Sequence, residues 1–282
     1  MNVEDIIQAN EQGFIGTEVC NVNMMELIKT RKSVRTFDGR MVSAEDREKL
    51  CSYIAAIRNP YNIPVAFVLL DAKENGLSSP VIEGEQIYIA AKVPKVAHCE
   101  EAFGYSFEKM VLYAWSLGIG TTWIGGTMKR ELFEKAAETG EHESMMIVSP
   151  LGYPAKKKSE VDVKLRKAVH ADERLAASEL FFDEDFSKPL NGEDSDNLLE
   201  AVRWAPSAVN IQPWRVVRRG NAFHFYKKRA QDYIRKVAWD VQKIDMGIAL
   251  CHFMSVADGT FEITDPSIAT NEDIEYIATV TV

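Results

Sequence analysis

Three short segments of the chain carry the side chains best suited to chemistry. The first, Arg31–Arg35, reads RKSVR and places three cations and a hydroxyl within five residues. Cations at this density bind a phosphate through charge-assisted hydrogen bonds. The alternative is a solvated helix end with its cations near the helix C-terminus. The segment therefore predicts either an anion-binding site or an exposed helix end.

The second segment, Ala205–Trp214, reads APSAVNIQPW. Its two prolines favour an extended loop, and Ser207, Asn210 and Gln212 supply hydrogen-bond donors and acceptors. Such a loop can present backbone and amide groups to a planar heterocycle. The alternative is a plain helix stop and strand entry, with Trp214 packed in the core.

The third segment, Gly118–Gly126, reads GIGTTWIGG. It resembles a dinucleotide-binding fingerprint, but its third glycine is displaced and the run follows a predicted helix rather than a strand. A Rossmann site is therefore not expected. Glycines carry no side chain, so the backbone N–H groups of this loop can approach a ligand closely. The sequence also lacks a P-loop and paired metal ligands, and no metal ion is expected.

Periodicity, capping residues and apolar runs predict the elements that position these segments. Helices are expected over residues 43–57, 100–117, 195–204 and 240–256, and strands over residues 64–70, 88–93, 145–148 and 214–218. Residues 155–178 are rich in charge, which indicates a solvated segment crossing between two halves of the chain.

The second half of the chain repeats the first in outline. A shift of 149 residues aligns Phe37 with Phe186, Leu50 with Leu199, and Pro64 with Pro213. The shared order of helix, turn, strand and long helix favours a diverged duplication more strongly than these identities do. The expected division is an N-terminal arm at 1–25, a first half at 26–170 and a second half at 171–282.

Composition limits the possible partners. Lysine and arginine number 33 against 42 acidic residues, which gives a net charge of −9. Such an acidic surface opposes phosphate neutralisation, so nucleic acid is not an expected partner. The four cysteines lie far apart, no signal peptide is recognisable, and the longest uncharged run reads as a buried helix entering a loop. A cytoplasmic protein without a membrane partner is expected.

The three segments together resemble the FMN-dependent nitroreductase family. The resemblance rests on RKSVRTF, APSAVNIQPW, and LGIGTTWIGG followed by SPLGYP, and it covers about residues 26–160 and 178–258. It implies an α+β fold and homodimers that hold FMN at the subunit interface. In that arrangement, the RxSxR segment of one subunit faces the PSxxNxQPW segment of the other.

This sequence departs from the family in the order of its parts. The two segments lie in different halves, and the 149-residue shift places Leu180, Phe182 and Glu184 at the positions of the RxSxR residues. The turn after the first predicted helix reads RNPYNIP, which keeps only part of the pattern APSAVNIQP. We therefore expect a single-chain pseudo-dimer with one intact FMN site and one lost site. A monomer suffices for that site, and a homodimer remains possible.

The resemblance implies a role for each matching residue. Arg31 and Ser33 hold the FMN phosphate and ribityl end, and Arg35 lies near N1 and the C2 carbonyl of the flavin. Arg174 also reaches the phosphate, although Asp172 replaces its usual basic neighbour.

The remaining implied ligands belong to the other two segments. The opposite edge of the flavin is lined by Pro206, Ser207, Ala208 and Asn210. A backbone N–H near flavin N5 comes from the loop formed by Trp123, Ile124, Gly125 and Gly126. No side chain is expected to be catalytic, because flavin N5 carries the chemistry.

The function implied is an FMN-dependent oxidoreductase. It passes hydride from NAD(P)H to a small-molecule electron acceptor, such as a nitroaromatic or a quinone. The same constellation could serve dehalogenation or flavin reduction. The alternative from another class is a non-catalytic or degenerate flavin-binding protein of the same fold.

Overall fold

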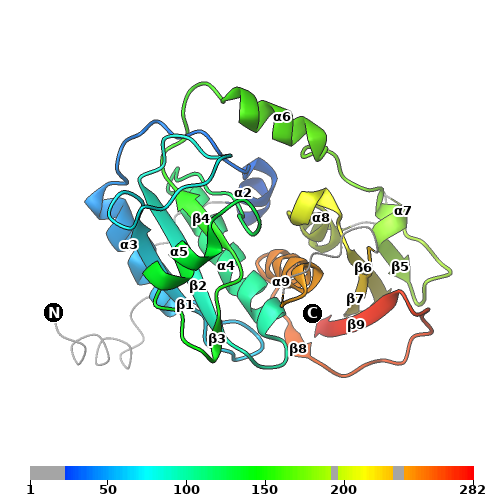
Figure 1. Cartoon of the computed structure of the whole chain (residues 1–282). Helices are drawn as coiled ribbons and strands as arrows, with labels where there is room; N and C mark the ends of the chain where they lie inside the picture. The colour runs from blue at the N-terminus through cyan, green and yellow to red at the C-terminus, as the bar shows by residue number, and fades with distance from the viewer. Residues whose placement is uncertain (1–22, 192–195, 231–237) are drawn as a thin grey trace.

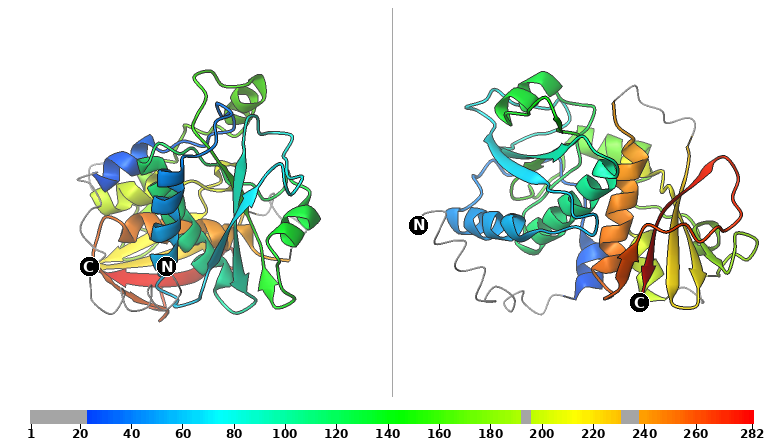
Figure 2. Two further views of the ribbon diagram at one scale, coloured as in Figure 1. Left: turned by 90° about the vertical axis from the view of Figure 1, so that its left-hand side faces the viewer. Right: turned by 90° about the horizontal axis from the view of Figure 1, so that it is seen from below.

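Two long helices, α4 (Cys99–Ser116) and α9 (Val241–Met254), lie at the centre of the molecule between two sheets (Figures 1 and 2). The computed structural model describes residues 23–191, 196–230 and 238–282. The helices cross at Gly104 and Gly247, where an added Cβ would overlap a backbone carbonyl oxygen of the other helix. Only glycine permits this approach, so these two residues set the distance between the two sheets.

The first sheet is antiparallel and centred on β2 (Ile87–Pro94). This strand pairs with β1 (Ala66–Asp71), β4 (Val148–Leu151) and the short β3 (Glu143–Ser144). Five consecutive buried residues open β2, as expected of a strand covered on both faces. Besides α4, the chain segment that forms this sheet contains the helices α2 (Met24–Thr30), α3 (Ala44–Ala56) and α5 (Arg130–Ala136).

The second sheet has the order β5-β6-β7-β9-β8. Its strands are β5 (Phe181–Asp183), β6 (Trp214–Arg219), β7 (Ala222–Lys228), β8 (Thr260–Glu262) and β9 (Ile274–Thr281). Only β5 and β6 pair in parallel; the other neighbours are antiparallel. Helix α8 (Asn197–Arg203) and the 3₁₀ turn η2 (Ala208–Asn210) precede β6.

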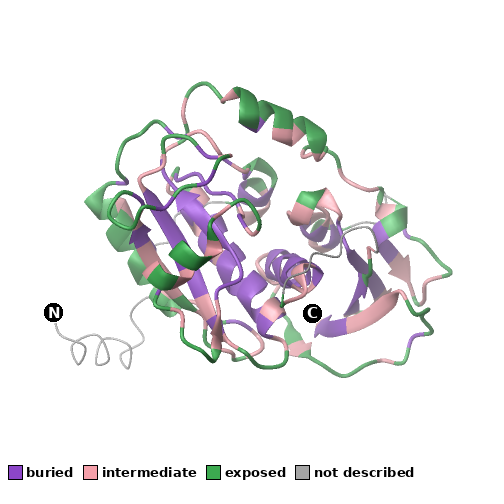
Figure 3. Cartoon of the chain, viewed as in Figure 1, coloured by how far each residue is buried: buried purple, intermediate pink, exposed green. Residues whose placement is uncertain are grey.

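The chain passes from the first sheet to the second through α6 (Glu160–Ala168) and α7 (Ala177–Leu180). Helix α6 lies across the top of the molecule in Figure 1, and its outer side is exposed in Figure 3. Within the described ranges, no helix has the length and apolar character needed to cross a membrane.

The expected α+β fold is confirmed, and the predicted helices and strands occur with shifted ends. One strand prediction is wrong: residues 145–147 are irregular, and β4 begins only at Val148. The guanidinium of Arg130 donates to the carbonyls of Met145 and Met146, at 2.5 and 2.9 Å, in place of a strand neighbour.

The crossing segment at residues 155–178 is mostly exposed, as expected of a solvated segment, and it contains α6. Its one buried residue is Asp162, which is 1% exposed. Most of the N-terminal arm expected at 1–25, and Ser195 at the start of a predicted helix, lie outside the described residues.

Candidate functional site

A cavity of about 340 Å³ lies where the two sheets and α6 meet. Its walls come from the α2–α3 connection, the loop after α4, the α6–α7 connection, the α8–η2 turn and the start of α9. All twelve residues that the sequence singled out as ligands line it: Arg31, Ser33, Arg35, Trp123, Ile124, Gly125, Gly126, Arg174, Pro206, Ser207, Ala208 and Asn210. The structure thus brings together residues that lie up to 179 positions apart in the chain, Arg31 and Asn210.

The RKSVR segment reaches the cavity because it runs alongside the glycine-containing loop. Ser33 and Thr121 form a parallel bridge, and the Val34 amide donates to the Thr121 carbonyl at 2.8 Å. A Cβ on Gly120 would lie 2.7 Å from the Val34 side chain, so glycine permits this close contact. Arg31 is 8% exposed, which makes the alternative of a solvated helix end wrong for this residue.

Arg31 is a buried cation with incomplete partners. Its Nε lies 3.8 Å from Oε1 of the fully buried Glu108. Its Nε and Nη1 are buried and have no hydrogen-bond partner in the described part of the chain. Burial lowers the pKa of Arg31 despite the attraction of Glu108.

Glu108 connects the cation to the helix pair. Its Oε1 lies 3.0 Å from Nε2 of His252 on α9, and its Oε2 accepts a hydrogen bond from the Trp123 indole at 3.2 Å. The Nδ1 atom of His252 lies 3.0 Å from the Ala201 carbonyl oxygen of α8. This buried network joins α4, α8 and α9 to the cavity wall.

Arg174 is a second, half-buried cation of the site. It donates from Nη1 to the carbonyls of Ala171 and Glu173, at 3.1 and 2.7 Å, while its buried Nε has no partner among the described residues. Burial, followed by repulsion from Arg31, lowers the pKa of Arg174 to about 10.

Arg166 of α6 is a third cation, which the sequence analysis missed. It pairs with Asp172 at 2.5 Å, and its positive charge contributes to the lowered pKa values of Arg31 and Arg174. Asp172, which replaces a basic residue of the resembled pattern, thus holds a cation from α6. Three guanidinium groups therefore converge on one side of the cavity.

Arg35 holds α6 against the cavity through an ion pair. Its Nη1 lies 3.2 Å from Oδ1 of the buried Asp162, and the Ser159 amide donates to the Thr36 hydroxyl at 2.9 Å. The exposed Lys156–Lys158 run lies just before this helix. The inner side of α6 therefore forms a wall of the cavity, while its outer side faces solvent.

The turn after α8 forms the opposite wall and is held by specific bonds. The Ala208 amide donates to Oδ1 of Asp245 at 3.1 Å, and the Gln212 amide donates to the Ser207 hydroxyl at 2.8 Å. The side-chain amide of Asn210 donates to the carbonyls of His170 and Glu173, so it supports the loop that carries Arg174. Trp214 is fully buried, as the alternative interpretation of this segment also required.

The loop after α4 offers fewer free donors than expected. The Ile124 amide donates to the Val148 carbonyl at 2.9 Å, and the Thr122 amide donates to the Ser149 hydroxyl at 3.0 Å. Ile124 therefore lines the cavity through its side chain and is excluded as the expected N–H donor. Trp123, Gly125 and Gly126 remain candidates for that role.

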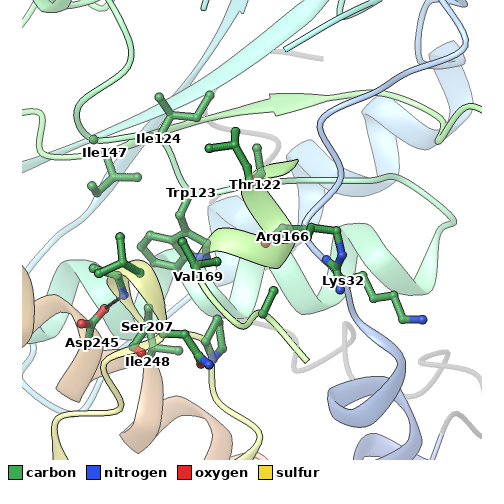
Figure 4. Close-up of a pocket in the computed structure, with 18 of the residues that line it drawn as sticks. Lys32, Thr122, Trp123, Ile124, Ile147, Arg166, Val169, Ser207, Asp245 and Ile248 are labelled. Atoms are coloured by element: carbon green, nitrogen blue, oxygen red, sulfur yellow. Dashed lines mark hydrogen bonds between the residues drawn. The ribbon is translucent and has the colours of Figure 1, made fainter. Parts of the chain in front are cut away.

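Asp245 of α9 is the second residue that the sequence analysis missed. It is 3% exposed, and its Oδ2 has no hydrogen-bond partner in the described chain. Burial raises the pKa of this carboxyl well above its usual range. Figure 4 shows Lys32 and Arg166 on one side of the cavity and Asp245 on the other, together with Ile147.

The family model described as putative TM nitroreductase matches residues 23–257. The chain belongs to this nitroreductase family. No curated protein matches the chain.

A solved structure shows the same fold as this member of the family. A putative nitroreductase from Thermotoga maritima is 18% identical, with a TM-score of 0.58 over 95% of this chain and 97% of that one. A nitroreductase family protein from Clostridium difficile is 18% identical, with a TM-score of 0.45 over 56% of this chain and 96% of its own. An FMN-dependent nitroreductase from the same species is 16% identical, with a TM-score of 0.41 over 50% and 95%.

Proposed function

We propose that this nitroreductase binds FMN in the cavity and reduces a small acceptor with electrons from NAD(P)H. The observation that carries the proposal is the set of buried nitrogen atoms of Arg31 and Arg174 that have no hydrogen-bond partner among the described residues. A buried N–H group without an acceptor is costly, and a phosphate would supply the missing acceptors. Arg166 adds a third charge at the same place.

The rest of the cavity fits a flat ring system. Trp123, Ile124, Ile147 and Ile248 offer apolar surface, while Ser207 and nearby backbone groups offer a few polar contacts. When bound, FMN supplies hydride transfer between NAD(P)H and the acceptor. The chain itself holds the phosphate through Arg31 and Arg174, places the ring, and excludes water beneath α6.

We further propose that the two sheets are diverged halves of one duplicated unit. In support, β1, β2 and β4 pair around β2 as β6, β7 and β9 pair around β7. The crossing of α4 and α9 at one glycine from each helix also fits this view. The cavity then takes Arg31 and Arg166 from the first half, and Arg174 and the Pro206–Asn210 turn from the second.

A lost second site follows from the same comparison. Leu180 and Phe182, which the 149-residue shift aligns with Arg31 and Ser33, are apolar. In the first half, the turn after α3 carries Tyr61, whose ring packs 4.8 Å from Phe261 and 5.5 Å from His98.

The test is the flavin content of the purified protein after saturation with FMN and removal of excess. We expect about one FMN per chain, from the absorbance of released flavin against protein concentration. Two per chain would contradict the lost site, and none would contradict the proposed function.

Turnover separates the enzyme from the flavin-binding alternative. We expect NADH or NADPH to bleach the bound flavin under anaerobic conditions and a quinone to restore its absorbance. A bound flavin that neither dinucleotide reduces would favour the non-catalytic protein.

A further inference from the structure

Asp245 is the acid of the cavity that has no cationic partner among the described residues. Of the two acids among the described lining residues, Asp172 pairs with Arg166 at 2.5 Å. The Oδ1 atom of Asp245 accepts a hydrogen bond from the Ala208 amide at 3.1 Å. Its Oδ2 is buried beside the cavity with no partner in the described chain. A carboxylate would leave this oxygen uncompensated, whereas a carboxylic acid has a proton to donate.

The surroundings favour the neutral acid. Burial is the largest cause of the raised pKa of Asp245, and the negative charge of Asp240, the N-cap residue of α9, adds to it. Among the described groups, the Ala208 amide opposes the shift. The cations that line the cavity are Lys29, Arg31, Lys32, Arg35, Arg166 and Arg174. Two of them, Lys32 and Arg166, lie on the far side from Asp245 in Figure 4.

Asp245 lies on the apolar side of the cavity. In Figure 4 it lies beside Ser207 and Ile248 and away from the cations. A phosphate held by the cations would therefore lie at a distance from this acid. The ring and any acceptor stacked on it would occupy the side on which Asp245 lies.

We propose that Asp245 donates a proton to the carbonyl or nitro oxygen of the acceptor during its reduction. The proposal rests on the proposed function, because the acceptor receives its hydride from NAD(P)H by way of the bound cofactor. For a quinone, one hydride and one proton give the hydroquinone. The Oδ2–H bond breaks, an O–H bond forms on the acceptor, and the Asp245 carboxylate recovers its proton from water.

The experiment compares Asp245→Asn with wild type and with Asp258→Asn. Asparagine keeps the size of the side chain and an oxygen for the Ala208 amide, but it has no titratable proton. Asp258 is an exposed acid beyond the end of α9 and serves as the matched control. The FMN-loaded proteins are first reduced and then mixed in a stopped-flow instrument with 1,4-benzoquinone or with ferricyanide, which takes electrons without protons.

We expect Asp245→Asn to slow reoxidation by benzoquinone about 100-fold, a typical effect of removing a general acid. Ferricyanide should react at the wild-type rate, and Asp258→Asn should match wild type with both acceptors. The wild-type quinone rate should fall as pH rises through the pKa of Asp245, while the Asn variant should show no such limb. Equal quinone rates, or equal losses with both acceptors, would overturn the proposal.

A second measurement does not depend on turnover. The folded protein with a raised Asp245 pKa holds a proton that the unfolded chain releases near pH 4. The stability contributed by this group is therefore fully present below about pH 4 and is lost as pH rises toward the folded pKa. We expect the melting temperature of Asp245→Asn apoprotein to exceed that of wild type increasingly as pH rises.

An infrared band of a protonated carboxyl, present in wild type at neutral pH and absent in Asp245→Asn, would agree with that result. Its absence from wild type would overturn the proposal even if the variant failed to bind FMN. Failure of wild type to bind FMN would instead overturn the proposed function. Normal FMN binding and turnover with unchanged quinone kinetics in Asp245→Asn would overturn only the role of Asp245.

Discussion

Two hollows of this protein differ in what makes a binding site. The cavity beneath α6 measures about 340 Å³, and a groove along α3 and β1 measures about 540 Å³. The larger groove is lined by residues of one part of the chain, and its cation, Arg58, is exposed and donates to the carbonyls of Ala55 and Ile57. The smaller cavity contains cations with buried nitrogen atoms that have no hydrogen-bond partner among the described residues. Unsatisfied buried charge, rather than volume, marks the site.

The largest expected effect tests this contrast directly. The double variant Arg31→Met, Arg174→Met should raise the Kd of FMN about 100-fold or more. The physical reason is that each charge-assisted hydrogen bond contributes about 1.5–3 kcal/mol. Fluorescence titration of the apoprotein measures the Kd, and circular dichroism checks that the variant folds. Arg58→Met is the matched control and should leave the Kd unchanged; an equal loss in both proteins would contradict the assignment of the cavity.

The Glu108→Gln variant should separate folding from ligand binding. Removing one partner of a buried ion pair destabilises a protein by about 3 kcal/mol, so the melting temperature of the apoprotein should fall. The affinity for FMN should rise, because a negative charge beside the proposed phosphate site is lost. Glu101→Gln, also buried on α4, should give no gain in affinity. Weaker FMN binding in Glu108→Gln would contradict this account.

The Gly247→Ala variant should damage the cavity and spare the groove. The added methyl overlaps the backbone of Glu101 on α4, and such overpacking costs about 1–3 kcal/mol. Both the melting temperature and the FMN affinity should fall, since the two walls belong to different sides of this crossing. Gly140→Ala is the control, because its Cβ would meet only the carboxylate of Glu143 at 3.3 Å. An unchanged melting temperature in Gly247→Ala would mean that the helices separate at little cost.

The smallest effect concerns the exposed Val209 on the cavity rim. Its φ of 45° lies in the left-handed region, which β-branched residues disfavour and asparagine tolerates. Val209→Asn should therefore stabilise the protein by about 1 kcal/mol, as measured by urea unfolding, with FMN affinity unchanged. Val163→Asn, an exposed position of α6, should bring no such gain. A loss of stability in Val209→Asn would show that the contacts of the valine side chain stabilise the protein by more than the backbone strain at this residue costs.

Local sequence signals were sufficient for most elements. Ser43 caps α3, as the sequence indicated, and the apolar run after it forms β1. The strand expected at residues 145–148 begins only at Val148. The reason is that the side chain of Arg130, 15 residues before Met145, binds the carbonyls that a neighbouring strand would otherwise bind. Apolar runs show that a segment is buried, but not which partner its backbone finds.

The candidate site, too, has residues that the sequence predicts and residues that it does not. Its twelve expected residues belong to three conspicuous segments and one matched position, Arg174, and all lie around one cavity. Arg166 and Asp245 escaped notice because each lies in an ordinary helical pattern. Their importance arises from tertiary neighbours: Arg166 from Arg31 and Arg174, and Asp245 from the Ala208 amide and its burial. No spacing rule along the chain encodes such encounters.

The crossing of α4 and α9 within a single polypeptide also affects how the site responds to dilution. Where two walls of a binding site belong to separate molecules, the complete site disappears as the protein concentration falls below their dissociation constant. Here Arg31 and the Pro206–Asn210 turn are covalently linked, so each wall meets the other at a fixed effective concentration. Cofactor occupancy should then depend on the concentration of free FMN alone, even at nanomolar protein.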